Sequence, residues 1–273
     1  MDAPVAYGSA GRKIPVPPVL RLPAIAASSE LTVLDARITA TARRACASTR
    51  QTLCEAYSAA RHVDDVGSVH PAMRDELSQY LNQAARAFDS DSSLSRCLVE
   101  FDVREAVRRR GAADRTLVGM LQQMHRWLGA GNGEFRRGPI AIKPDEMGNS
   151  VVFPDAGQCV PLVETLQSFL ADNLPRYPGM SAVVALVAIV HAHPFGDGNG
   201  RAARTLFNAL LAKGCGTDHF MPLSLLAHLS GGGFILKLRR AMYGAEWDQL
   251  GAYIAEALAL SDRLQHPDGD PRP

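Results

Sequence analysis

The chain has 273 residues, 47% of them hydrophobic, and its formal net charge is +1. This hydrophobic fraction is normal for a globular protein, and so small a net charge gives no reason to expect binding to bulk nucleic acid or to an anionic membrane. The five cysteines are scattered and follow no disulfide or zinc-module spacing, so we expect reduced thiols and a cytoplasmic protein.

The amino-terminal segment 1–29 is rich in Pro, Gly and Ala and has no periodic apolar pattern, which predicts an extended or disordered arm. Four prolines between positions 15 and 23 interrupt any apolar stretch and argue against a signal peptide. Delivery of the protein into another cell stays open. The longest apolar run, 182–190, is much too short to span a bilayer, so no membrane association is expected.

Residues 30–111 are predicted to form a helical extension before the main domain. Leu34, Ile38 and Ala42 recur at helical spacing and form an apolar stripe. Such a stripe more often packs against other helices of the same chain than binds a partner protein. A further amphipathic helix is predicted over 117–128.

A short β signal interrupts the helical pattern between residues 129 and 155. β-branched pairs at Ile140/Ile142 and Val151/Val152 flank a stretch with Pro, Gly and Asn, which is typical of a hairpin. Helical segments then follow, and we predict them over 161–174, 181–191, 201–211 and 234–259. The sequence therefore predicts an all-α protein with one small hairpin, a main domain over 112–260 and a flexible tail over 261–273.

The most informative stretch runs from His193 to Arg204 and reads His-Pro-Phe-Gly-Asp-Gly-Asn-Gly-Arg-Ala-Ala-Arg. It lies between two predicted helices, so anionic groups would meet the amino terminus of the second helix. A histidine has an unperturbed pKa near physiological pH, which makes His193 a candidate general base. Asp197 is a hard oxygen ligand of the kind that Mg²⁺ prefers when it bridges phosphates.

The rest of the stretch suits the binding of phosphates. Gly198 and Gly200 allow the backbone to approach an anion and turn its N–H groups inward, and Asn199 tolerates the left-handed conformations of such a bend. Arg201 and Arg204 lie three residues apart, so on a helix they share a face and could hold phosphate oxygens.

Two plainer interpretations stand beside this one. A short loop of Gly, Asp and Asn between helices is often only a turn, and His193 could be a histidine satisfied near the core. His191 and His193 could instead suggest a metal pair, but their spacing does not share a helix face and no further ligand follows at a suitable distance.

The stretch resembles the signature of the Fic (Fic/Doc) family, H-P-F-x-[D/E]-G-N-G-R-x-x-R, and every fixed position of that signature is present. The resemblance extends to 133–136 and 139–142, which are similar to the β-hairpin flap that aligns the target segment in this family. The flap residues are then Ile140, Ala141 and Ile142. Residues 30–111 resemble, more loosely, the helical extension of many Fic proteins.

The resemblance implies a Mg²⁺-dependent protein adenylyltransferase that moves AMP from ATP to a Tyr, Thr or Ser hydroxyl of a target protein. His193 would be the base and Asp197 the metal ligand. Three alternatives stay open: transfer of phosphocholine, which uses the same loop; phosphorylation, which is typical of altered loops; and a nucleotide-binding regulatory or toxin-like module without turnover. The residues expected to hold ATP are Gly198, Asn199, Gly200, Arg201 and Arg204.

Many Fic proteins also carry an inhibitory helix with the pattern [S/T]-x-x-x-E-[G/N], whose glutamate pairs with the second arginine of the signature. The best placed candidate here is Glu55, although Gln51 and Ala56 depart from the pattern. An exposed helix glutamate is the alternative. A homo-oligomer or an antitoxin-like partner chain could supply such a brake instead.

Overall fold

The computed structural model describes residues 12–60, 71–75, 90–110, 116–142 and 150–267. One helix, α7 (Pro178–Ala192), lies at the centre, and all its residues except Val190 are buried. Its Ala-, Val- and Leu-rich sequence has no polar face, so it must be covered on every side. Helices α1 (Ser29–Arg44), α6 (Cys159–Asn173), α8 (Asn199–Cys215), α10 (Gly233–Gly244) and α11 (Trp247–Gln265) pack against it.

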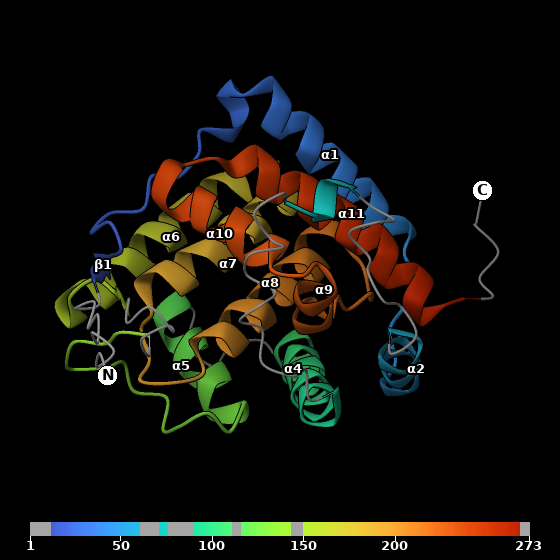
Figure 1. Cartoon of the computed structure of the whole chain (residues 1–273), viewed down its shortest axis with the longest axis horizontal. Helices are drawn as coiled ribbons and strands as arrows, with labels where there is room; N and C mark the ends of the chain where they lie inside the picture. The colour runs from blue at the N-terminus through green and yellow to red at the C-terminus, as the bar shows by residue number, and fades with distance from the viewer. Residues whose placement is uncertain (1–11, 61–70, 76–89, 111–115, 143–149, 268–273) are drawn as a thin grey trace, which may run out of the picture.

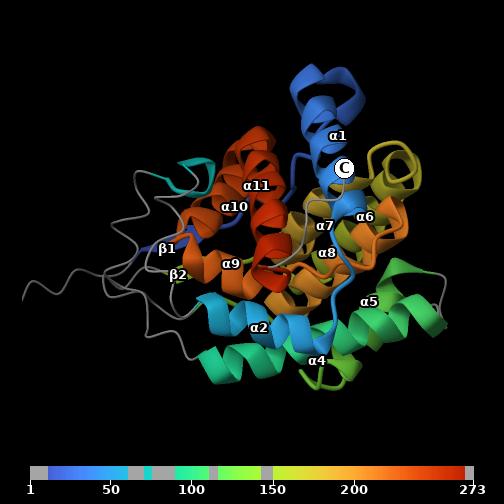
Figure 2. The ribbon, with the colours of Figure 1, turned by 90° about the vertical axis from the view of Figure 1, so that its right-hand side faces the viewer.

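The other helices extend this core on the side of α8. Helix α4 (Ser90–Arg110) and helix α5 (Leu117–Trp127) both pack on α8. Helix α2 (Arg50–Ala60) lies beside α4, as Figure 2 shows, and also contacts α11 and the short α9 (Leu223–Leu229). Single 3-10 turns occur at Ile25–Ala27, Pro71–Met73 and Ala156–Gln158. The fold is all-α, as the sequence predicts.

The amino-terminal helix is joined firmly to the centre of the molecule. The buried Asp35 on α1 accepts a hydrogen bond from the backbone N–H of Met180, 2.8 Å away, and so caps the first turn of α7. A side chain on Gly179 would come within 2.8 Å of Ile38, so the glycine permits the close approach of the two helices. Figure 1 shows α1 lying along α11, at the opposite end of the chain.

Two segments predicted from the sequence to be loose are ordered where the structure describes them, and the predicted helical extension is part of the core. Within 30–111, Ile38 and Leu53 belong to the same hydrophobic core as Leu258. The described part of the arm is not loose, since Ile25 is buried in that core and 13–15 form a strand. Residues 261–265 complete α11 instead of fraying. The rest of the arm (1–11) and of the tail (268–273) lies outside the described residues.

A small β-structure lies at one end of the helical body. Strand β2 (Ser150–Val152) bridges to Ala141 in an antiparallel sense, which is the predicted hairpin. Strand β1 (Lys13–Pro15) pairs with the other edge of β2 in a parallel register, with Ile14 opposite Val151. The arm thus becomes part of the hairpin, which no local sequence signal indicated. In the described ranges, no helix is long and apolar enough to cross a membrane.

Candidate functional site

The candidate site lies on the loop between α7 and α8, where the chain reverses direction in a few residues. His193 ends α7 in the left-handed conformation, with φ 46°, and Gly198 begins α8 with φ 76°. A left-handed conformation is uncommon for a residue other than glycine, and such strain is concentrated at functional sites. The bend presents the first backbone N–H groups of α8 at the mouth of the loop.

Asn199 holds this bend from the inside. Its carboxamide oxygen accepts a hydrogen bond from the N–H of Phe195, and its amide nitrogen donates one to the Phe195 carbonyl, both at 2.8 Å. Both side chains are buried. Both polar atoms of the Asn199 side chain are thus engaged inside the loop, and the role of Asn199 in holding ATP stays a prediction.

A second residue, His125 on α5, supports the loop from below. Its ring stacks on the ring of Phe195 with 3.9 Å between centroids, and its Nε2 lies 2.9 Å from the carbonyl oxygen of Asp197. Since that oxygen can only accept, Nε2 carries the proton. A Cβ on Gly198 would lie 2.5 Å from Ala130 and 3.2 Å from His125, so only glycine fits there. We infer that His125 positions the loop, a role that sequence reasoning missed.

Arg136 joins the loop to the hairpin. Its Nε donates to the carbonyl of His193 at 2.8 Å and its backbone N–H to the carbonyl of Pro194 at 2.8 Å. The other guanidinium nitrogens donate to the carbonyls of Gly138, at 2.8 Å, and Pro154. A guanidinium has several donors in a fixed plane, which allows one side chain to hold three carbonyls. Arg136 thereby fixes the position of the hairpin relative to the loop between α7 and α8.

The hairpin leaves one backbone edge unpaired by the described residues. Ile142 N–H donates to Val151 and Phe153 N–H donates to the carbonyl of Ile140, so these groups face β2. Ala141 lies between them in a non-hydrogen-bonded pair with Val152, and its own N–H and C=O therefore point to the opposite side. Ala141 and Ile142 are exposed. The edge predicted to dock a target strand is thus accessible.

His193 lies against a ring of the same hairpin. Its imidazole stacks on Phe153 with 3.7 Å between centroids, and burial lowers the pKa of His193 to about 4, against the opposing effect of its hydrogen bond to Val190. Its Nδ1 lies 3.2 Å from the Val190 carbonyl, which can only accept, so Nδ1 carries the proton. The ring is thus neutral at neutral pH, and its Nε2 has a free lone pair.

The charged residues of the loop pair with one another or with a neighbouring helix. The carboxylate of Asp197 is 85% exposed and lies 3.3 Å from Nη2 of Arg201, one helical turn away. An exposed pair of this kind is weak, so either partner can leave it for a ligand. Asp197 stands beside the amino terminus of α8, where anions are also favoured.

Arg204 is held by a carboxylate that the sequence did not reveal. Its Nε lies 3.1 Å from Oε2 of Glu100 on α4, and its Nη2 contacts Oε1, so the pair is bidentate. The Glu100 side chain is 3% exposed and that of Arg204 is 21% exposed. Burial raises the pKa of the Glu100 carboxyl, while Arg204 opposes that rise. A forked pair shielded from water is far stronger than a surface pair.

The prediction that Glu55 would be the partner of the second arginine is therefore wrong. Glu55 lies on the exposed face of α2 and accepts a hydrogen bond from Gln51 on the same helix, at 2.9 Å. Glu100 matches the inhibitory pattern poorly, with Arg96 and Phe101 at the specified neighbours. The sequence feature that could have indicated Glu100 is its place as the one carboxylate within the otherwise apolar run 97–101, where an unpaired charge would be costly.

The stacked pair at His193 leads to a first testable prediction. In Phe153→Ala, water should reach the imidazole, and the pKa of His193 should rise from about 4 toward its ordinary value of 6.5. An NMR titration of the histidine ring signals measures this. The control is Phe135→Ala, because the ring of Phe135 packs edge-on against the ring of Phe195, with 5.1 Å between the ring centroids. A His193 that titrates near 6.5 in the parent protein would contradict the burial argument.

The comparisons with known proteins agree with this geometry. Residues 117–211 match the Fic/DOC family model. Protein adenylyltransferase Fic of Aedes aegypti is 34% identical over 104 residues, which are 36% of this chain and 20% of that protein. The protein of the same name from Culex quinquefasciatus is 32% identical over an equal share. The chain thus spans about a fifth of the length of these curated relatives.

Solved structures extend the likeness to the whole fold. A Fic family protein from Desulfovibrio desulfuricans G20 has a TM-score of 0.57 at 19% identity, covering 90% of this chain and 75% of that one. Fic-1 from C. elegans has a TM-score of 0.50 at 15% identity, covering 87% and 73% respectively. This chain therefore has the helical fold of these Fic proteins, and its residues 117–211, which carry the complete signature on the loop between α7 and α8, match the Fic/DOC family.

Proposed function

We propose that the protein transfers AMP from ATP to a hydroxyl side chain of a target protein. The observation that carries the proposal is the placement of a neutral imidazole, His193, beside the amino terminus of α8 and its two arginines. The base, the phosphate site and the hairpin lie around one bend, as in-line displacement at a phosphorus atom requires. The names of the matched relatives support the same activity.

In the proposed reaction, Nε2 of His193 takes the proton of the incoming hydroxyl as its oxygen attacks the α-phosphorus. A bond forms between that oxygen and phosphorus, the bond to the bridging oxygen breaks, and pyrophosphate leaves. The low pKa favours this role, because the ring is already neutral at neutral pH and its free nitrogen can accept at once. The same low pKa also makes the imidazole a weaker base.

The phosphate chain would be held chiefly by backbone and by arginine. The N–H groups at the start of α8 point toward the loop mouth. Gly198 keeps the loop free of a side chain, and Arg201 can turn from Asp197 to a phosphate oxygen because their pair is exposed. Positioning and charge stabilisation of this kind supply most of the catalysis in phosphoryl chemistry.

Asp197 fits a Mg²⁺ ion of the kind that ATP carries. It offers one exposed carboxylate next to the phosphate site, and protein-bound Mg²⁺ is commonly held by one or two carboxylates together with substrate phosphates. When bound, the ion would offset charge on the phosphate oxygens. The remaining chemistry belongs to residues of the chain.

The reaction class can be tested with ATP labelled on the α-phosphate and a crude or self-modified protein acceptor. We expect protein-bound label in the parent and a loss of at least about 10²-fold in His193→Ala, because general-base catalysis typically contributes about 10²–10⁴-fold. His228→Ala, which changes a histidine of α9 outside the loop, should keep the parent rate.

Other outcomes of that experiment identify the alternatives. Label retained only from the γ-phosphate would indicate a kinase, and binding of ATP without retained label would indicate a regulatory module. Label transferred only from a donor labelled in its phosphocholine group would indicate transfer of that group. A variant His193→Ala that transfers AMP at the parent rate would exclude His193 as the base.

We further propose that Glu100 restrains the enzyme from within its own chain. Its carboxylate occupies the guanidinium of Arg204 with both oxygens, so Arg204 cannot bind the phosphates of ATP until that pair opens. Glu100 lies on α4, which packs on α8, and a shift of α4 would separate the pair. No antitoxin-like partner is needed to supply this carboxylate.

The brake predicts that Glu100→Gly raises self-modification by about tenfold or more, since each 1.4 kcal/mol of lost restraint is worth a factor of ten. Glu55→Gly on α2 is the matched control, because it makes the same change in a helix and carries a similar propensity cost. Modification rates are measured with α-labelled ATP. Equal rates in Glu100→Gly and the parent would show that the ion pair is not the brake.

The open hairpin edge is proposed to dock the target segment by strand addition. The outward N–H and C=O of Ala141 are the groups that would pair with it. Ala141→Pro removes that N–H without touching the bonds of Ile142 and Phe153 to their partners.

We expect Ala141→Pro to reduce modification of protein targets about tenfold while ATP affinity stays unchanged, because one bond and the fit of the strand are lost. Ala141→Val is the control, since it keeps the N–H and adds a β-branched side chain. The measurements are labelling of a protein target and calorimetric ATP binding. A parallel fall in both would indicate a disturbed fold in place of a docking defect.

A further inference from the structure

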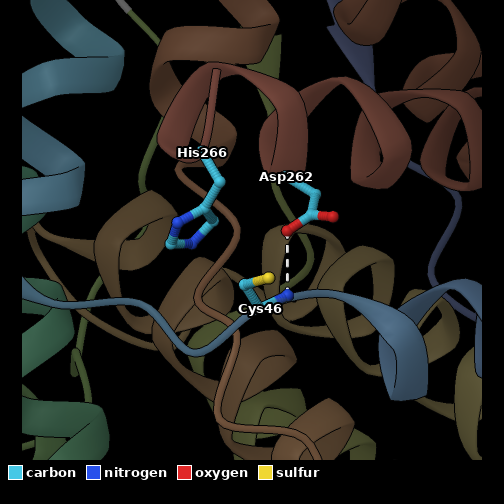
Figure 3. Close-up of side chains that lie close together, drawn as sticks. All are labelled: Cys46, Asp262 and His266. Carbon is cyan, nitrogen blue, oxygen red and sulfur yellow. Dashed lines mark hydrogen bonds between the residues drawn. The ribbon is translucent and has the colours of Figure 1, made fainter. Parts of the chain in front are cut away.

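Away from the Fic loop, three side chains that can bind metals meet where the link after α1 lies against the end of α11. Cys46 lies in the link between α1 and α2, while Asp262 and His266 lie one helical turn apart at the end of α11. One ligand atom from each residue lies within 4.8 Å of the others. Figure 3 shows the sulfur, the carboxylate and the imidazole gathered around a common space.

The backbone around these side chains is already fixed by hydrogen bonds. Oδ1 of Asp262 accepts the N–H of Cys46 at 2.9 Å, as the dashed line in Figure 3 marks. The N–H of His266 donates to the carbonyl of Asp262 at 2.9 Å. Ligands that are held before binding lose less conformational freedom when an ion arrives.

A chain of buried hydrogen bonds also holds the backbone of Cys46. His219 Nδ1 lies 3.0 Å from the Cys46 carbonyl, and His219 Nε2 lies 3.0 Å from Oγ of Ser261. Gln265 in turn donates to that Oγ at 3.0 Å. Because the carbonyl oxygen of Cys46 can only accept, His219 donates to it through Nδ1. These hydrogen bonds orient Cys46, whose thiol faces Asp262 and His266.

The imidazole of His266 carries the second observation. Its Nε2 is buried and has no hydrogen-bond partner, whereas buried polar atoms of proteins are nearly always paired. Leaving such an atom without a partner costs free energy. A metal ion bound by the cluster would supply that partner directly.

We propose that Cys46, Asp262 and His266 bind one divalent transition-metal ion of the zinc type. Thiolate and imidazole ligands select such ions over Mg²⁺ and Ca²⁺, which prefer oxygen. On binding, the Cys46 thiol releases its proton to solvent as the metal–sulfur bond forms. One thiolate, one carboxylate and a neutral imidazole then balance the two charges of the ion, which suits a half-buried place.

The ion would act as a clamp between distant parts of the chain. Cys46 and Asp262 are 216 positions apart, and α11 packs on both α1 and α2. Binding to the folded chain alone would therefore stabilise the contact between the α1–α2 link and the end of α11. The fourth coordination position would be left to water, because the described residues offer three ligand atoms there.

The test uses the full-length protein, reduced and freed of metal with a chelator, and Co²⁺ as a coloured substitute for Zn²⁺. We expect a thiolate-to-cobalt charge-transfer band at about one equivalent, displaced by Zn²⁺ and unaffected by excess Mg²⁺. The band should disappear in Cys46→Ser and persist in Cys54→Ser, which changes an exposed cysteine of α2. His266→Ala should weaken the affinity at least about tenfold.

A second readout protects the test from a variant that folds poorly. Zn²⁺ should raise the Tm of the parent and of Cys54→Ser, and should raise that of His266→Ala clearly less at the same Zn²⁺ concentration. His266 follows the last residue of α11 and is only half-buried, so its removal leaves the helix intact. Absence of the cobalt band in the parent, its survival in Cys46→Ser, or a Zn²⁺-dependent rise of Tm in His266→Ala as large as in the parent would overturn the proposal.

Discussion

A reciprocal pair of hydrogen bonds between the Asn199 carboxamide and the backbone of Phe195 closes the bend between α7 and α8. Both residues are buried, so no water competes for these bonds. Every other part of the site is placed relative to that bend. His193 stands at one end of it, and the first turn of α8 opens at the other.

The same bend explains why the surrounding residues are so constrained. His125 stacks under Phe195 and holds the carbonyl of Asp197, and the side-chain-free Gly198 makes room for it. Arg136 then joins the outer face of the bend to the hairpin through backbone carbonyls. Since these contacts are made to main-chain atoms, they fix the geometry of the bend and leave the side chains of the loop free for the reaction.

The pair Glu100–Arg204 joins α4 to α8. It places a buried carboxylate against a partly exposed guanidinium, and removing one partner of a buried pair commonly costs about 3–5 kcal/mol. Because the Glu100 side chain is 3% exposed and that of Arg204 is 21% exposed, the arginine is the partner that solvent can reach. In the proposed brake, a shift of α4, which packs on α8, would release Arg204 for ATP.

The sequence by itself determined the features that are local along the chain. The signature from His193 to Arg204 is contiguous, so its bend, its helix start and its family could all be predicted. The hairpin at Ile140–Ile142 was predictable for the same reason, because β-branched residues and turn residues alternate within a short span. The helical pattern around both segments followed from apolar spacing.

Only the tertiary structure decided which distant residues meet. Glu100 and Arg204 are 104 positions apart, so the sequence did not show that they pair, and the partner of Arg204 was predicted wrongly to be Glu55, which lies on an exposed helix face. The pairing of β1 with β2 and the low pKa of His193 were equally hidden, since both arise from segments folded against each other. Local propensity reports what a segment can form, while burial and charge pairing depend on what the fold places next to it.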